Sequence, residues 1–139
     1  MGDFGDLARL AEQAAAMGAG IVGVNPLHAL FPHNPAHASP YSPSSRRWLN
    51  LLYLDVEAIP DFRECAAARR RVRSAPFQAW LARLRGTDLV DYPGAAAAKF
   101  EILELLYAHF RERHLAAGGA RAAAFRAFQD HGGSSLRQH

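Results

Sequence analysis

The stretch that decides the fold runs from residue 21 to residue 26 and reads Ile21-Val22-Gly23-Val24-Asn25-Pro26. Its first four residues are apolar and mostly β-branched, and no polar residue alternates with them. A run of this kind is typical of a strand that is buried on both faces, as in a parallel sheet. Asn25 and Pro26 end the predicted strand and begin a long loop.

The residues around this strand predict α/β structure for residues 1–60. Asp3 or Asp6 can cap a first helix, which the glycines at 18 and 20 would end. The apolar residues of that helix recur at helical spacing, at Leu7, Leu10, Ala14 and Met17. After the loop, residues 51–56 predict a second short strand. The first part of the chain is therefore expected to be helix, strand, long loop and strand.

Residues 61–139 are predicted to be all-helical, with a boundary near Pro60. One helix is expected over residues 61–73, and another starts at Ser74-Ala75-Pro76 and ends at Gly86. Its apolar stripe is Phe77, Trp80, Leu81 and Leu84. A longer helix follows residues 91–94 and breaks at Gly118-Gly119. A last short helix carries Phe125 and Phe128 and ends at Gly132-Gly133.

One buried parallel strand has no partner strand within this pattern, so its backbone groups would lack hydrogen bonds. The chain is therefore expected to be part of a larger fold. Its formal net charge is +3, which is too small to indicate nucleic-acid binding. The arginines at 69, 70, 71 and 73 point in several directions on a helix, and a solvated helix face is the favoured interpretation.

No apolar run is long enough to cross a membrane, so no membrane contact is predicted. Cys65 is the single cysteine, which rules out an internal disulfide and fits a cytoplasmic protein. The first residues show neither a basic region nor an apolar signal core. A cytoplasmic location is the resulting prediction.

The loop from Asn25 to Asn50 is the candidate binding site, because α/β folds bind ligands on loops after the carboxyl ends of parallel strands. Five of the eight prolines lie in it and stiffen it. Sugars need aromatic faces and many hydrogen-bonding groups. The loop offers both, at Asn25, His28, Ser39, Tyr41, Ser42, Ser44, Ser45, Trp48 and Asn50. The alternative is an ordinary proline-rich surface loop.

Two other patterns are weaker. His33 and His37 have a helical zinc spacing, but Pro35 between them disfavours a helix, and no metal site is predicted. Asp55 and Glu57 would share one face of a strand. Retaining glycosidases also use two neighbouring carboxyl groups, one as nucleophile and one as acid/base. A solvated strand end is the favoured interpretation of that pair.

Several segments resemble the 4-alpha-glucanotransferases of glycoside hydrolase family 77, also known as amylomaltases. These segments are residues 2–7, 23–32, 39–50 and 53–56, with weaker similarity at 98–100 and 124–128. The most specific is the run Ser39-Pro40-Tyr41-Ser42-Pro43-Ser44-Ser45-Arg46-Arg47-Trp48-Leu49-Asn50. The resemblance implies a (β/α)8 (TIM) barrel with an inserted all-helical subdomain. Residues 1–60 would be a partial barrel segment, and residues 61–139 the helical insertion.

The resemblance also implies an activity and site residues. The family transfers α-1,4-glucan segments between maltooligosaccharides with retention and without a metal or organic cofactor. It places Tyr41 against the sugar beside the bond that is cut and Ser39 near it. Asn25, His28 and Asn50 also match the family pattern, as further substrate-binding candidates.

The family's reacting carboxylates lie on later strands, and no stretch of this sequence resembles those segments. Asp55 and Glu57 are therefore not expected to be the catalytic pair, and no catalytic residue is predicted here. The chain is expected to be an internal slice that supplies a sugar-binding loop, with the remainder of the same barrel as its partner. A non-catalytic carbohydrate-binding or interaction module is the alternative.

Overall fold

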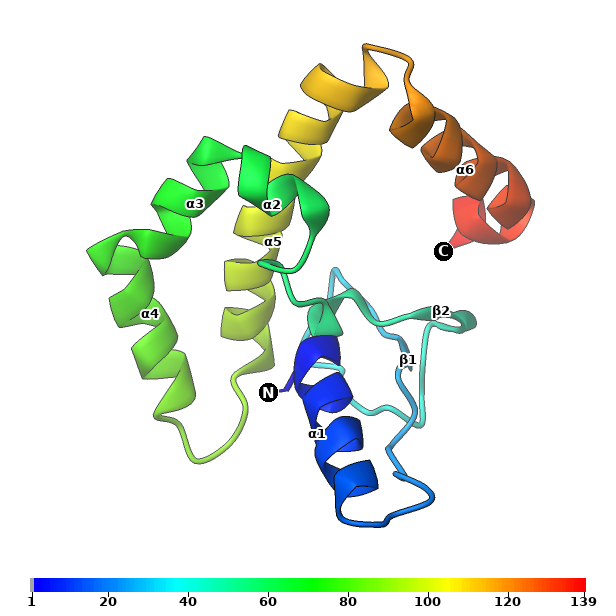
Figure 1. The fold of residues 1–139 in the computed structure, drawn as a ribbon. Helices are drawn as coiled ribbons and strands as arrows, with labels where there is room; N and C mark the ends of the chain where they lie inside the picture. Colours follow the sequence, from blue (N-terminus) through cyan, green and yellow to red (C-terminus); the bar gives the residue numbers. More distant parts are fainter. Residues whose placement is uncertain (1) are drawn as a thin grey trace.

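The computed structural model describes residues 2–139, and they are mostly helical (Figure 1). Between the first helix and the others lie two short strands, β1 (His28–Ala29) and β2 (Ser45–Leu49), and a 3-10 helix, η1 (Leu51–Tyr53). The helices are α1 (Phe4–Ala16), α2 (Pro60–Glu64), α3 (Ala66–Arg73), α4 (Ala75–Arg85), α5 (Tyr92–Phe110), the π-helical turn η2 (Arg111–Leu115) and α6 (Ala120–Gln138).

Helix α5 is the centre of the helical part, and α2, α3 and α4 pack around it (Figure 1). Ile102 of α5 is 1% exposed and lies in the middle of the core. Side chains from all four helices surround it, namely Phe62, Cys65, Ala68, Val72, Phe77, Ala98 and Leu106. The prediction of an all-helical region over residues 61–139 agrees with this arrangement.

Local capping explains where two of these helices begin. The Ser74 hydroxyl accepts a hydrogen bond from the Phe77 N–H and caps α4. Asp91 accepts the Gly94 N–H at 2.9 Å and caps α5, with a proline in the first turn. Helix α4 starts where the sequence predicted it, whereas α5 starts at Tyr92, within the residues 91–94 that were expected to precede it.

The helix predicted over residues 61–73 is divided in two at Cys65. This residue has φ −80° and ψ 95°, so it ends α2 and begins α3. Its side chain is buried, and its Sγ lies 3.7 Å from the Leu105 carbonyl oxygen of α5. The chain bends here so that both short helices can lie against α5.

The parallel strand predicted over residues 21–24 is not formed among the described residues, and residues 2–139 show no barrel sheet. The sheet seen in residues 2–139 is antiparallel, with His28 opposite Leu49 and Ala29 opposite Ser45. Residues 21–24 pair with none of these strands; Ile21 is 89% exposed and Val24 is 52% exposed. A strand needs a neighbour for its hydrogen bonds, and residues 2–139 provide none here.

The prediction of a strand over residues 51–56 is wrong. Residues 51–53 form η1, and Asp55 then closes a turn. Its Oδ1 accepts the backbone N–H groups of Glu57 at 3.1 Å and Ala58 at 3.3 Å. The carboxylates of Asp55 and Glu57 therefore do not lie on one face of a strand. The Asp55 carboxylate instead stabilises the turn.

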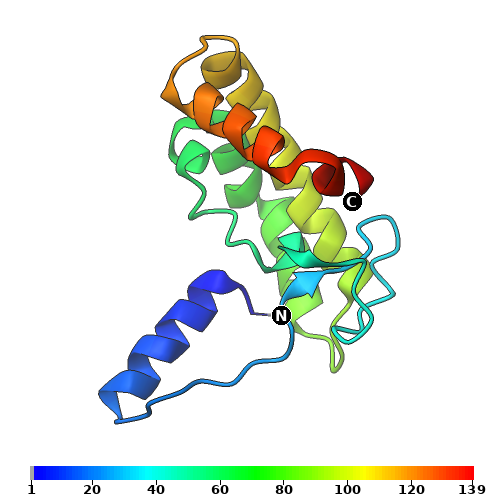
Figure 2. The same cartoon turned by 90° about the vertical axis from the view of Figure 1, so that its right-hand side faces the viewer.

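Helix α1 begins with a capping box, in which Asp3 and Asp6 each accept the other's backbone N–H. None of its residues is buried. Phe4 meets the ring of Tyr53 edge-on at 6.1 Å, near the start of the helix. Figure 2 shows α1 and the segment after it as an arm that stands away from helices α2–α5. Of its apolar residues, Phe4 and Leu7 are half-buried and Leu10 is 51% exposed.

Helix α6 is longer than predicted. It continues past the expected stop at Gly132-Gly133, where Gly133 has φ +52° and kinks it. A positive φ is easily adopted by glycine, so the break lies where the sequence placed it even though the chain resumes a helical path. None of the helices in residues 2–139 is both long enough and apolar enough to cross a membrane.

Candidate functional site

The loop from residue 25 to residue 50 contains two short strands, β1 and β2, which close its base. The Ser44 N–H donates to the Ala29 carbonyl at 2.9 Å, and its hydroxyl donates to the Ala29 and Leu30 carbonyls. The Asn50 N–H donates to the Leu27 carbonyl at 2.9 Å. Between these ties the chain follows tight turns, so the loop has a defined shape.

Tyr41 and Asn25 are brought together, although 16 positions separate them. The Tyr41 hydroxyl donates to Asn25 Oδ1 at 3.0 Å. Asn25 is exposed, and Tyr41 is 68% exposed. An aromatic ring that is held at its hydroxyl end and open on its sides can pack against the C–H face of a sugar.

Ser39 and His28 lie on the same loop, but in different settings. Ser39 is exposed, and its carbonyl accepts the Ser42 N–H at 3.2 Å, in a turn that contains Tyr41. His28 is half-buried in β1, opposite Leu49. Ser39 is thus close to Tyr41 along the chain, whereas His28 belongs to the base of the loop.

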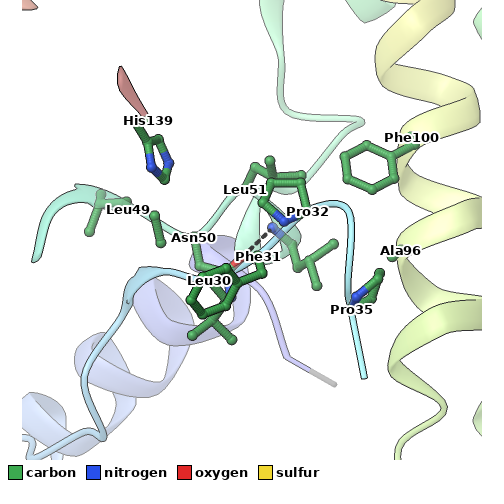
Figure 3. Close-up of a pocket in the computed structure, with 12 residues that line it drawn as sticks. Leu30, Phe31, Pro32, Pro35, Leu49, Asn50, Leu51, Ala96, Phe100 and His139 are labelled. Carbon is green, nitrogen blue, oxygen red and sulfur yellow. Dashed lines mark hydrogen bonds between the residues drawn. The ribbon is translucent and has the colours of Figure 1, made fainter. Parts of the chain in front are cut away.

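Asn50 is buried, at 5% exposure, and its side chain is used by the fold. Its Oδ1 accepts the Leu52 N–H at 3.0 Å and caps η1. Figure 3 shows Asn50 beside a cavity of about 20 Å³ lined by Leu30, Phe31 and Phe100 among others. That space holds roughly one water molecule and not a sugar. This setting gives Asn50 a structural role, and direct sugar contact by Asn50 remains a prediction.

Trp48 ties the loop to the far end of the chain. Its ring meets Phe128 of α6 edge-on, with the centroids 5.8 Å apart. Its indole N–H is buried, and no acceptor for it is found among residues 2–139. A buried donor without a partner is unusual. The sequence placed Trp48 among the sugar-site residues, whereas the structure places it against a helix.

A larger cavity, of about 380 Å³, lies between α4, α5 and the start of α1. Lys99 is the single lysine of the chain and lies in its wall, donating from Nζ to the Leu54 carbonyl. Burial lowers the pKa of Lys99, and the nearby Asp3, Asp55 and Asp6 partly oppose this. The other charged groups of the wall are mainly carboxylates, at Asp3, Asp55, Glu57, Asp88 and Asp91. The sequence does not predict this cavity, because its lining residues come from five separate segments.

The arginine cluster is partly used within the fold. Arg71 makes two hydrogen bonds to Glu101, one of them from its NH2 group at 3.0 Å. Its guanidinium also lies 4.9 Å from the ring centre of Phe77. Arg71 therefore joins α3 to α5, which leaves it unsuited to contact phosphate.

His33 and His37 do not gather as metal ligands. The ring of His37 stacks on Phe31 with centroids 4.7 Å apart, and His33 meets the same ring edge-on at 5.9 Å. Side chains that could hold a metal ion lie together in the helical part instead, at Glu64, His109 and His114. The sequence does not predict these three residues as ligands.

Comparison with known proteins adds independent evidence. The family described as 4-alpha-glucanotransferase matches residues 1–139. A 4-alpha-glucanotransferase of Haemophilus influenzae is 50% identical over 111 residues, which are 80% of this chain and 16% of that protein. A 4-alpha-glucanotransferase of Mycobacterium tuberculosis is 38% identical over 145 residues, which are 98% of this chain and 19% of that protein.

This chain therefore spans less than a fifth of the length of these curated relatives. The match extends over the helical part as well as the proline-rich loop. The run Ser39–Asn50 and the segments around it had already indicated this resemblance. The chain belongs to the 4-alpha-glucanotransferase family.

Proposed function

We propose that this chain is part of a 4-alpha-glucanotransferase, which moves α-1,4-glucan segments between maltooligosaccharides with retention of the anomeric configuration. Membership of the family supports the activity. A sugar-binding role for this part of the enzyme is supported by Tyr41. Its ring is exposed, and its hydroxyl donates a hydrogen bond to Asn25 Oδ1 at 3.0 Å. The chain contributes a sugar-binding surface to the enzyme.

On this surface, the ring of Tyr41 packs against the sugar beside the bond that is cut. Asn25 Oδ1 fixes the ring by accepting a hydrogen bond from the Tyr41 hydroxyl, and Ser39 offers a hydroxyl from the same turn. His28 lies at the base of the loop and Asn50 holds that base in place. A fixed ring loses little freedom on binding, which favours affinity.

The carboxylates that react are assigned to other parts of the enzyme. Retaining enzymes need two carboxyl groups about 5–5.5 Å apart, one as nucleophile and one as acid/base. Asp55 is engaged by two backbone N–H groups of its own turn, which suits a structural role. The transfer uses no metal or organic cofactor, and α-1,4-glucan is the substrate.

The remainder of the same barrel is the proposed partner of the α1 arm. Met17 and Ile21 are 87% and 89% exposed, and residues 21–24 have the composition of a buried strand. Neighbouring strands of a barrel would cover both faces of this run and satisfy its backbone groups. The chain spans less than a fifth of the length of its relatives, which agrees with this proposal.

The role of Tyr41 is tested by titrating maltooligosaccharide into the chain. Tyr41→Ala should weaken binding roughly tenfold or more, as expected for an exposed aromatic anchor. Tyr41→Phe keeps the ring and should lose less. Tyr107→Ala is the matched control, because Tyr107 is 51% exposed on α5. Unchanged affinity in Tyr41→Ala would contradict the assignment.

The assignment of the carboxylates is tested by incubating the chain with maltotriose. No glucose and no longer dextrins should form, since the chain lacks the reacting pair. Their appearance would show that the chain is catalytic by itself.

To separate the proposal from a non-catalytic sugar-binding module, Tyr41→Ala is made in the full-length enzyme. Transfer should slow if Tyr41 lies beside the reacting bond and stay unchanged if the loop only binds sugar.

A further inference from the structure

We propose that Glu64, His109 and His114 form a binding site for one divalent transition-metal ion, with Zn²⁺ as the expected ion. The site lies in the helical part and is independent of the proposed sugar loop. Two imidazoles and one carboxylate are a ligand set that zinc uses in proteins, with the fourth position taken by water.

The two histidines share one side of the helix because of a local change in its winding. His109 is in the last turn of α5, and His114 is in η2, five residues later. The Ala116 N–H donates to the Arg111 carbonyl at 3.0 Å, a hydrogen bond that spans five residues instead of four. The wider π turn brings His114 back toward His109, and their ring centres are 6.1 Å apart. Such turns are frequently found at functional sites.

Glu64 completes the set from a different element. It is the last residue of α2, the short helix that the bend at Cys65 lays against α5. Its Oε2 lies 3.4 Å from His114 Nε2 and 3.8 Å from His109 Nε2. All three ligand atoms lie within 4.8 Å of one another.

These separations fit a metal shell. Bonds to zinc of about 2.0–2.2 Å place neighbouring ligand atoms of a tetrahedron roughly 3.4 Å apart. Glu64 is 61% exposed and free to adjust by rotation of its side chain, whereas the histidines are 17% and 24% exposed. The site is thus nearly formed before the ion binds, and it opens to solvent on the Glu64 side.

The ring nitrogens of the two histidines are the strongest indication. His109 Nε2 and His114 Nε2 are both buried and have no hydrogen-bond partner among residues 2–139. Buried polar atoms without a partner are rare and costly. In the neutral ring with the proton on Nδ1, each Nε2 carries a free lone pair. A metal ion would engage both lone pairs at once.

Asp61 and Phe110 lie next to His114, and neither is expected to bind the ion. Asp61 Oδ1 is 3.4 Å from His114 Nε2, but both Asp61 oxygens accept hydrogen bonds from Arg121, at 2.8 and 2.6 Å. This pairing balances the charge of Asp61 and ties α2 to α6. The ring of Phe110 lies against His114, with centroids 6.0 Å apart, and restricts its orientation.

The test is calorimetric titration of the chain with Zn²⁺, and visible absorption of the Co²⁺ complex. One ion should bind per chain, and bound Co²⁺ should show the spectrum of a low-coordinate site with nitrogen and oxygen ligands. His109→Gln, His114→Gln and Glu64→Gln should each weaken Zn²⁺ binding tenfold or more, since loss of even an outer-shell partner costs about 10–100-fold. Glu64→Gln is informative even if the histidine variants misfold, because Glu64 is mostly exposed.

The matched controls are His131→Gln and Glu104→Gln, whose side chains are exposed on α6 and α5. Both should bind Zn²⁺ as the unmodified chain does. Absence of Zn²⁺ binding would overturn the proposal and leave the cluster as a histidine–glutamate ion pair. Binding that is unchanged in Glu64→Gln and both histidine variants would also overturn it, by locating the ion elsewhere.

Discussion

Asn50 illustrates how one polar side chain can hold a loop. It is 5% exposed, its backbone N–H binds the Leu27 carbonyl and its Oδ1 caps η1. The chain before and after it is therefore fixed at a single residue. A substitution of Asn50 should therefore lower the stability of the fold, whether or not it changes the binding of a ligand.

Asn50→Ala should lower the free energy of unfolding by about 1–2 kcal/mol, because it removes a cap and leaves the buried Leu52 N–H without its acceptor. Urea denaturation followed by tryptophan fluorescence measures the change, since Trp48 is two residues away. Asn34→Ala, at an exposed position of the same loop, should be nearly neutral. Unchanged stability together with weakened sugar binding would instead make Asn50 a direct ligand of the sugar.

Among the elements, α3 and α5 are joined by the bidentate pair of Arg71 and Glu101. Hydrogen bonds from Arg71 lower the pKa of Glu101, and its positive charge adds to the effect while burial opposes it. A pKa that is lower in the folded state stabilises the fold above the pKa of the unfolded chain. That contribution is lost as the pH falls through the folded-state pKa of Glu101.

Glu101→Gln should therefore flatten the acid side of the stability profile. Its melting temperature should fall less between neutral and acidic pH than that of the unmodified chain. Glu104→Gln is the control, since Glu104 is exposed on the same helix. Equal acid sensitivity in all three proteins would show that the pair between α3 and α5 contributes nothing measurable.

Helix α5 depends on its buried side as much as on its cap. Ile102 is 1% exposed at the centre of the four-helix core. Ile102→Ala should destabilise the chain by about 2–5 kcal/mol, through lost burial and the cavity left behind. Leu89→Ala, at a position that is 85% exposed, should change stability by less than about 0.5 kcal/mol. Comparable effects in denaturant titrations would contradict the assigned core.

At the scale of the whole molecule, the exposed apolar residues of the arm are the main weakness of the isolated chain. Helix α1 buries none of its residues, and Met17, Ile21 and Val24 are exposed. Exposed apolar side chains favour association. We expect the isolated chain to self-associate or to be loosely packed in this region.

The double substitution Ile21→Ser and Val24→Ser should reduce that self-association, as measured by light scattering at increasing protein concentration. Leu89→Ser removes an equally exposed apolar residue from another face and should have a smaller effect. A monomeric unmodified chain with a sharp, cooperative thermal transition would contradict the expectation.

The sequence by itself determined the features that depend on neighbouring residues. Asp3, Ser74 and Asp91 mark helix starts because a cap bonds to backbone only two or three positions away. The glycine at 133 marks a kink for a similarly local reason. The run Ser39–Asn50 also identified the family, because its length and composition are hard to reproduce by chance.

The tertiary structure decided what depends on distant residues. Residues 21–24 have the composition of a strand, but a strand forms only where another lies beside it, and residues 2–139 supply no neighbour. The helix is interrupted at Cys65, whose Sγ lies 3.7 Å from the carbonyl of Leu105, a residue 40 positions away on α5. Tyr41 finds Asn25 only when β1 and β2 close the loop. Glu64 meets two histidines only because α2 lies against a widened turn, and neither local propensity nor spacing encodes that contact.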